Sequence, residues 1–199
     1  MDKKPKKGEY LDVLLRSPWT VFSTKDVRLL WRETKAQTVT NRLNKYVKAG
    51  KLIRLRRGIY AKDDAYDRFE MATKIYTPSY ISFETVLTRE GVNFQYYETI
   101  FVASYVTREI EVLGQNIAFI HMKNYVLTNS VGIKHKGGYS IATKERAFLD
   151  RIYTSKDYHF DNLDGLNWDK VFEIASLYNN KRLEKKVQKY FEYYKSTNV

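Results

Sequence analysis

The sequence predicts an α+β protein in two parts: a small N-terminal part with helices and a hairpin, and a larger mixed α/β part that ends in helices. Apolar residues recur at helical spacing in some segments and at alternate positions in others. Residues 1–62 contain 17 Lys and Arg against 5 Asp and Glu, a net charge of +12, whereas residues 63–199 contain 18 of each. With 199 residues, 43% of them hydrophobic, the chain is long enough for two such parts.

Short elements are predicted at the start of the chain. Apolar residues at helical spacing predict a helix over residues 8–16, and Pro18 ends it because the residue before a proline avoids helical backbone angles. Residues 21–22 are β-branched and aromatic, which favours a short strand. Ser23, with Asp26 three positions later, is a suitable N-cap for a second helix.

A third helix is predicted over residues 35–49. Thr34 is followed three positions later by Gln37, the spacing of a capping box, and Gly50 is a suitable left-handed C-cap. No acidic residue occurs between positions 35 and 62. The polar face of this helix contains Gln37, Thr38, Asn41, Asn44, Lys45 and Lys48. Amides and hydroxyls flanked by lysines fit base-edge and phosphate contacts, although an ordinary solvated face is an equal alternative for one helix alone.

A basic hairpin is predicted after the third helix. If Leu55 points inward, Arg54 and Arg56 point outward, because side chains alternate along a strand. Residues 56–58 can form a three-residue loop with Gly58 in the left-handed conformation. Three helices followed by a hairpin with arginines at its tip are the order of a winged helix-turn-helix, whose third helix enters the major groove of DNA. We therefore predict an N-terminal winged helix-turn-helix followed by a mixed α/β domain with a terminal helical segment.

The concentrated positive charge suggests a polyanion as partner, and we expect double-stranded DNA. The side chains expected to approach base edges are Gln37, Thr38 and Asn41. Those expected to contact phosphates or a minor groove are Arg42, Lys45, Lys48, Arg54, Arg56 and Arg57. A two-fold operator would suit two copies of the protein.

The first domain is expected to span residues 1–62 and the second 66–199, since a polar, acidic stretch follows Lys62. In the second domain we expect a mixed sheet covered by helices. Ser82 is a candidate cap for one helix, Thr143 caps another, and residues 125–127 suggest a short strand.

No catalytic, metal-binding or cofactor-binding motif is found. The chain has no cysteine, which excludes disulfides and thiolate sites. His121, His135 and His159 lack the spacing of metal ligands, and no phosphate-binding loop motif occurs. Residues 184–186 fit a nuclease string but lie in a predicted helix. We expect a non-enzyme without signal peptide or membrane span, located in the cytoplasm.

Two other functions stay open at this stage. A nuclease or nucleic-acid-modifying enzyme could use the N-terminal domain for targeting, if acids or histidines dispersed in the sequence converge in space. A protein–protein adaptor is the other alternative, but it leaves the segregation of charge unexplained.

Four segments of the chain are similar, in this order, to segments of one known family: GKLIRLRRGIYA, SYISFETVLTREG (79–91), FVASYVTREIEV (101–112) and YSIATKERAFLDRIY (139–153). The family that they resemble is AbiEi, whose members are antitoxin-type transcriptional regulators of abortive-infection (type IV) toxin–antitoxin systems. The likeness extends from about residue 8 to 155, and the C-terminal helices match only in general character.

The resemblance implies a repressor whose winged helix binds inverted repeats in its own promoter. It also implies a C-terminal domain that helps repression and counteracts a nucleotidyltransferase-like toxin encoded beside it. The family places no catalytic residues on the antitoxin. A regulator without a toxin neighbour is also compatible with the sequence.

Overall fold

The computed structural model describes residues 4–6 and 8–197 of an α+β chain that divides into two compact units. The N-terminal unit comprises Met1–Ile75 with Gly137–Tyr139, and the C-terminal unit comprises the remainder. We expected the first domain to end at residue 62, whereas the contacts group the following helix with the N-terminal unit. Whether residues 1–62 function as a domain by themselves stays a prediction.

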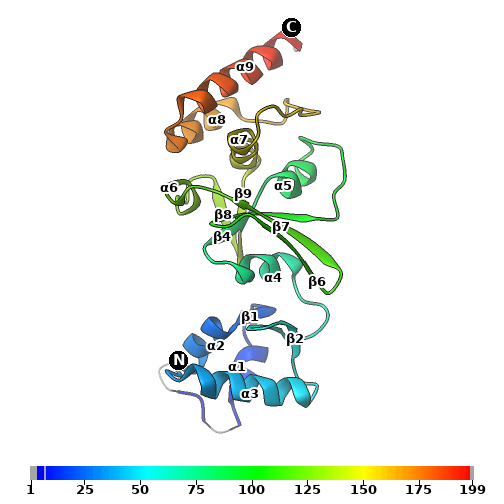
Figure 1. Ribbon diagram of the computed structural model, residues 1–199, viewed down its shortest axis with the longest axis vertical. Helices are drawn as coiled ribbons and strands as arrows, with labels where there is room; N and C mark the ends of the chain where they lie inside the picture. The colour runs from blue at the N-terminus through cyan, green and yellow to red at the C-terminus, as the bar shows by residue number, and fades with distance from the viewer. Residues whose placement is uncertain (1–3, 7, 198–199) are drawn as a thin grey trace. The chain divides into compact units, whose positions relative to one another are not determined.

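The N-terminal unit contains helices and a small antiparallel sheet (Figure 1). Its elements are α1 (Tyr10–Leu15), β1 (Val21–Ser23), α2 (Thr24–Trp31), α3 (Ala36–Lys48), β2 (Ile53–Arg56), β3 (Ile59–Ala61) and α4 (Arg68–Ile75). The sheet has the strand order β1-β3-β2, so the last strand lies between the other two.

Apolar side chains from the helices and the sheet form one core in this unit. The buried members are Tyr10, Leu14, Phe22, Val27, Trp31, Val39, Leu43, Leu52 and Tyr60. Trp31 is fully buried, and its indole Nε1 donates a hydrogen bond to the carbonyl oxygen of Tyr10 at 2.8 Å. This bond satisfies the polar group of the largest core side chain and links α2 to α1.

Of the two helix N-caps expected in the N-terminal unit, one is confirmed. Ser23 and Asp26 form a capping box at the start of α2, with each side chain accepting a hydrogen bond from the backbone of the other residue. The box expected at Thr34 is wrong, because α3 begins at Ala36 with Lys35 as its N-cap. Gln37 is therefore the second helical residue rather than the third, and its side chain is not used for capping.

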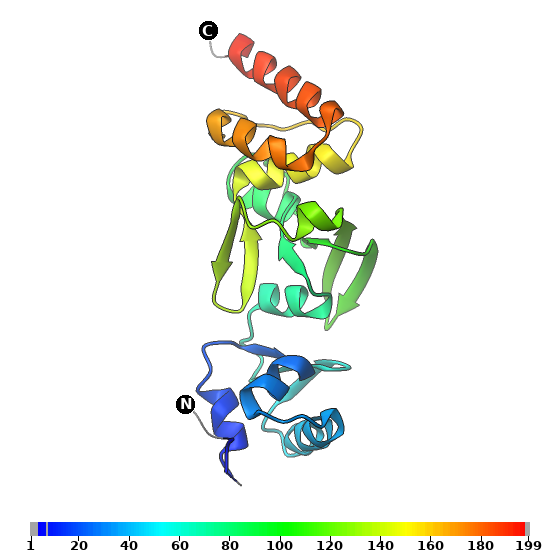
Figure 2. The same ribbon diagram turned by 90° about the vertical axis from the view of Figure 1, so that its left-hand side faces the viewer.

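The C-terminal unit contains a six-stranded mixed sheet in the order β6-β7-β5-β4-β9-β8. Its elements are β4 (Ser79–Ile81), α5 (Glu84–Arg89), β5 (Ile100–Ser104), β6 (Arg108–Val112), β7 (Gln115–His121), α6 (Asn124–Leu127), β8 (Ile133–Lys136), β9 (Tyr139–Ala142), α7 (Lys144–Thr154), α8 (Trp168–Ala175), η1 (Ser176–Tyr178) and α9 (Lys181–Thr197). Strands β5 and β7 pair in parallel, as do β4 and β9. Helix α7 lies against α5, α8 and α9 (Figures 1 and 2).

Two local predictions fail in the C-terminal unit, and one holds. Residues 125–127, expected as a strand, belong to helix α6. The N-cap of α5 is Phe83 rather than Ser82. Thr143 caps α7 as expected, with its side chain accepting from the backbone N–H of Arg146. Across the described ranges 4–6 and 8–197, the helices are too short or too polar to cross a bilayer.

Candidate nucleic-acid interface

Helix α3 presents one exposed polar stripe, which comprises Gln37, Asn41, Lys45 and Lys48. Spacings of four, four and three residues place these side chains on the same side of the helix. Gln37 Nε2 donates a hydrogen bond to Asn41 Oδ1 at 2.8 Å. The two amides therefore hold each other in place, while the remaining oxygen of Gln37 and nitrogen of Asn41 can meet other partners. Thr38, also expected at base edges, is half-buried beside this stripe.

The opposite side of α3 fixes the orientation of the stripe. Val39 and Leu43 are fully buried in the core. The ring of Tyr46 meets that of Trp31 edge-to-face, with centroids 6.3 Å apart. Because these contacts lock the rotation of the helix about its axis, the α3 stripe is held outward.

The β2–β3 hairpin is a second basic surface in the same unit. Arg54 and Arg57 are exposed, and Arg56 is half-buried. The register shifts between Arg54 and Arg56, so a β-bulge re-aims the strand just before the turn. Leu55 and Ile59 are buried and hold the hairpin to the unit.

The tip of the hairpin is tied to α2. Gly58 has φ +82°, the left-handed conformation that its position in the turn was expected to need. Its carbonyl oxygen accepts a hydrogen bond from the backbone N–H of Thr24 at 2.9 Å. The exposed arginines therefore extend from a fixed turn.

The side chain of Arg42 does not belong to the α3 stripe. Its guanidinium carbon is 3.5 Å from the centroid of the Tyr10 ring and 5.5 Å from that of Trp31, distances typical of cation–π contact. Position 42 is turned by about 100° from position 41, so its side chain points toward α1 rather than along the stripe. Its role as a phosphate contact stays a prediction.

Two acids of the same unit, Asp26 and Glu33, already have partners. Asp26 forms the capping box and accepts from Lys74 Nζ at 2.9 Å. Glu33 pairs with Lys4 at 2.7 Å, and the hydrogen bond from Lys4 lowers the pKa of its carboxyl. These two carboxylates are therefore neutralised by lysines outside the α3 stripe and the hairpin, and they take little from the positive field of those two surfaces.

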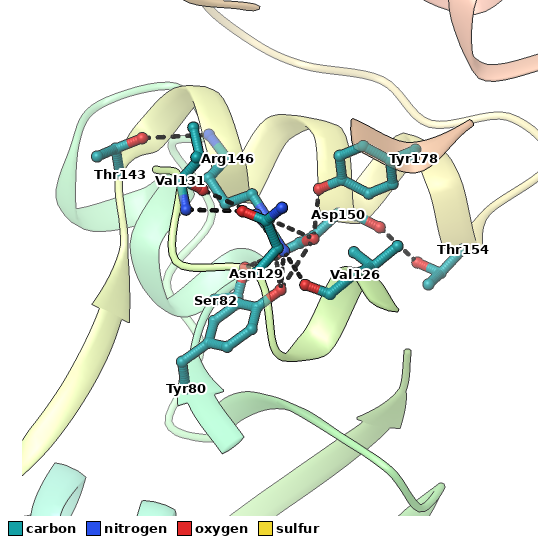
Figure 3. A network of polar contacts seen from close by, with 10 residues as sticks. All are labelled: Tyr80, Ser82, Val126, Asn129, Val131, Thr143, Arg146, Asp150, Thr154 and Tyr178. Carbon is teal, nitrogen blue, oxygen red and sulfur yellow. Dashed lines mark hydrogen bonds and ion pairs between the residues drawn. The ribbon is translucent and has the colours of Figure 1, made fainter. Parts of the chain in front are cut away.

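The C-terminal unit contains a fully buried charge cluster that sequence reasoning missed (Figure 3). Arg146 and Asp150 have no exposed surface and form an ion pair at 3.2 Å on one face of α7. Arg146 also donates to the Tyr80 hydroxyl at 2.9 Å and to the carbonyl oxygens of Val126 and Val131 at 2.7 and 2.8 Å. All three nitrogens of this guanidinium therefore donate hydrogen bonds, and the acceptors come from several segments.

Asp150 accepts hydrogen bonds from three hydroxyls besides Arg146: Tyr178 at 2.6 Å, Ser82 at 2.7 Å and Tyr80 at 3.0 Å (Figure 3). Burial raises the pKa of the Asp150 carboxyl, although Arg146 and the hydroxyl donors oppose this shift. Burial would lower the pKa of Arg146, but its interactions with Asp150, Tyr178 and Tyr80 together outweigh that effect and raise it. Since a guanidinium keeps its charge in proteins, the carboxylate acts as its counter-ion.

The backbone between β4 and α5 is strained beside this cluster. Phe83 has φ 54° and ψ −139°, which a non-glycine residue rarely adopts. The residues on both sides of it contact α7: Ser82 donates to Asp150, and Glu84 Oε1 lies 3.1 Å from Arg151 Nε. We attribute the unusual angles of Phe83 to these two polar contacts and to the burial of its own ring.

The described residues include no group of three or more His, Cys, Asp or Glu side chains that could hold a metal ion. His135 pairs with Ser140, and His159 lies near Asp161 on the surface. No protein-family model matches the chain, and a search of curated proteins finds no match either.

Proposed function

We propose that the N-terminal unit is a winged helix-turn-helix that binds double-stranded DNA, with α3 in the major groove and the β2–β3 hairpin as the wing. The element order α1-β1-α2-α3-β2-β3 supports this assignment. The observation that carries the proposal is the surface formed by the α3 stripe and the hairpin, because amides, lysines and arginines are exposed there within a segment that contains no acid.

Each part of this surface has a chemistry that DNA requires. Gln37 and Asn41 can donate to and accept from base edges in the major groove. Lys45, Lys48 and the hairpin arginines can neutralise phosphates and release counterions. The mutual hydrogen bond of the two amides reduces the conformational freedom that they lose on binding.

We further propose that the protein acts as a repressor of its own operon and as the antitoxin of a toxin–antitoxin pair. The ordered resemblance of four segments to the AbiEi family supports this part, and the winged helix would bind operator inverted repeats as two copies. The C-terminal unit would counteract a nucleotidyltransferase-like toxin.

DNA binding is tested by the salt dependence of operator affinity. Each phosphate that the protein neutralises contributes a slope of about −0.9 to log K against log salt. Arg54→Ala with Arg57→Ala should therefore make the slope shallower by about 1.8 and weaken binding at low salt. The matched control is Lys185→Ala with Lys189→Ala, which removes the same charge from exposed positions on α9. An unchanged slope in the arginine variant would remove the hairpin from the interface.

Sequence readout is tested separately. Gln37→Ala should weaken binding to the operator by about 1–3 kcal/mol while leaving the affinity for unrelated duplexes unchanged. The measurement is competition between operator and random duplex at fixed salt. Equal losses on both duplexes would show that α3 does not read bases.

The antitoxin role is tested by co-expressing the full chain with the product of the adjacent reading frame. The Arg54→Ala, Arg57→Ala variant should lose repression but still rescue growth, if the C-terminal unit neutralises the toxin. If the product of the adjacent reading frame is not toxic, the antitoxin role is wrong and only the role as a transcriptional regulator is left.

A further inference from the structure

The C-terminal unit contains an open pocket of about 500 Å³, lined by residues of α5, β8, β9, α7 and α8. Small-molecule sites in proteins have volumes of about 300 to 1,000 Å³. The pocket lies entirely within one unit, and none of the residues considered above for DNA contact lines it. Its size therefore suits a ligand such as a mononucleotide.

Four lysines line this pocket: Lys134 and Lys136 on β8, Lys144 at the start of α7 and Lys170 on α8. Among the residues that the structure describes, none of these four ammonium groups has a carboxylate within ion-pair distance. Like charges gathered around one concavity repel each other and favour an anion between them. The N–H groups in the first turn of α7 carry partial positive charge, part of which the carboxylate of Glu145 in the same turn offsets.

The rest of the lining is mixed. Val86, Ile141 and Ile174 supply apolar surface. Glu90, Glu145 and Glu173 supply carboxylates, which can accept hydrogen bonds from amino groups. Glu145 already accepts one from the backbone N–H of Asn167. A ligand that uses all three features has an anionic group, a flat apolar body and hydrogen-bond donors. Nucleotides combine a phosphate with a base that has those properties.

One wall of the pocket is held in place by the buried charge cluster (Figure 3). The carbonyl oxygen of Val131 accepts from Arg146 Nη1 at 2.8 Å. Gly132 follows with φ +75°, and a Cβ atom there would lie 2.9 Å from the Cβ of Arg146. The segment before β8 therefore packs directly on α7, and little ordering of this wall is needed when a ligand enters.

We propose that this pocket binds a small phosphorylated molecule of the nucleotide class, with the phosphate among the four lysines and the base on the apolar wall. Duplex DNA is a poorer fit, because a concave site lined by carboxylates as well as lysines does not match an extended backbone of phosphates. The inference concerns a different unit from the DNA-binding proposal and does not depend on it.

The test is isothermal titration of the full chain with each of ATP, GTP, CTP and UTP at fixed ionic strength. Adenosine and inorganic phosphate are the partial ligands. At least one nucleotide should bind saturably and more tightly than either partial ligand. Lys144→Ala with Lys170→Ala should weaken that binding about 100-fold, since one charge-assisted contact accounts for about tenfold. Lys134→Ala with Lys136→Ala removes two charges from another element and should have a similar effect.

The control is again Lys185→Ala with Lys189→Ala, which should bind the nucleotide as the unaltered protein does. Thermal melting of each variant checks that it is folded. Absence of saturable binding below about 1 mM, or affinities equal within twofold in all three variants, would overturn the proposal. If the pocket variants weakened binding of a duplex but not of any nucleotide, the lysines would be a DNA contact and the proposal would be wrong.

Discussion

Removing the carboxylate of Asp150 should destabilise the C-terminal unit more than any surface substitution. Asp150→Ala leaves Arg146 without a counter-ion and removes the acceptor for the hydroxyls of Tyr178, Ser82 and Tyr80, all within 3.0 Å. Both charged groups are fully buried, so water cannot replace the lost partner. Breaking a buried pair in this way costs about 3–5 kcal/mol. That is a large share of the roughly 5–15 kcal/mol by which a typical domain is stable.

The assay is urea unfolding followed by circular dichroism. With a slope of about 2 kcal/mol per molar urea, a loss of about 4 kcal/mol lowers the midpoint by about 2 M. Glu192→Ala, on an exposed position of α9, removes a carboxylate of the same charge and should change stability by less than about 0.5 kcal/mol. Arg146→Met combined with Asp150→Leu should be less destabilised than Asp150→Ala, because no uncompensated charge is left. This account would be refuted if Asp150→Ala lost less than about 1 kcal/mol of unfolding free energy. It would also be refuted if the double variant were no more stable than Asp150→Ala.

Three further outcomes are expected. Glu70→Ala should destabilise the N-terminal unit by about 2–3 kcal/mol in chemical denaturation, because this buried carboxylate accepts three hydrogen bonds from the Thr20–Val21 segment. Gly58→Ala should cost about 1–2 kcal/mol, since the alanine must adopt a positive φ. Burial, followed by the nearby carboxylate, raises the pKa of Tyr80 and Tyr178 well above the ordinary value. Their protonated hydroxyls therefore contribute stability below about pH 10 that is lost as pH rises further, since the unfolded chain releases these protons first. A free energy of unfolding that stayed constant from about pH 9 to pH 12 would contradict this.

Much of the N-terminal unit could be predicted because its signals are local. The Ser23 cap, the left-handed Gly58 and the apolar face of α3 each depend on residues within a few positions of one another. The cap expected at Thr34 failed through a shift of one residue in the start of α3, which sequence spacing cannot resolve. Arg42 was expected to contact DNA because of its charge, whereas the direction of its side chain depends on the ring of Tyr10, which belongs to α1.

The buried charge cluster could not be predicted from the sequence, because its members are far apart in the chain. Tyr80 and Ser82 meet Asp150 across about seventy residues, and Tyr178 joins from the other side in sequence. The only local signal was an arginine and an aspartate four positions apart on the helix that Thr143 was expected to cap. Ser82 was expected to cap α5, but its hydroxyl is used for the cluster instead.

The exposed cations and the buried charge cluster use charge in opposite ways: the first attract a ligand, and the second stabilises the fold. Experiments can therefore separate their functions. The cations of the α3 stripe, the hairpin tip and the pocket lie at the surface, and no carboxylate among the described residues pairs with them. Replacing them therefore removes attraction to an anion but little packing. Arg146 and Asp150 are fully buried and paired with each other, so replacing either one lowers stability rather than changing a contact with a ligand. A variant of an exposed cation that lost binding and kept its unfolding midpoint would therefore identify a contact with a ligand. A cluster variant that lost binding would show only that the pocket wall depends on a folded α7.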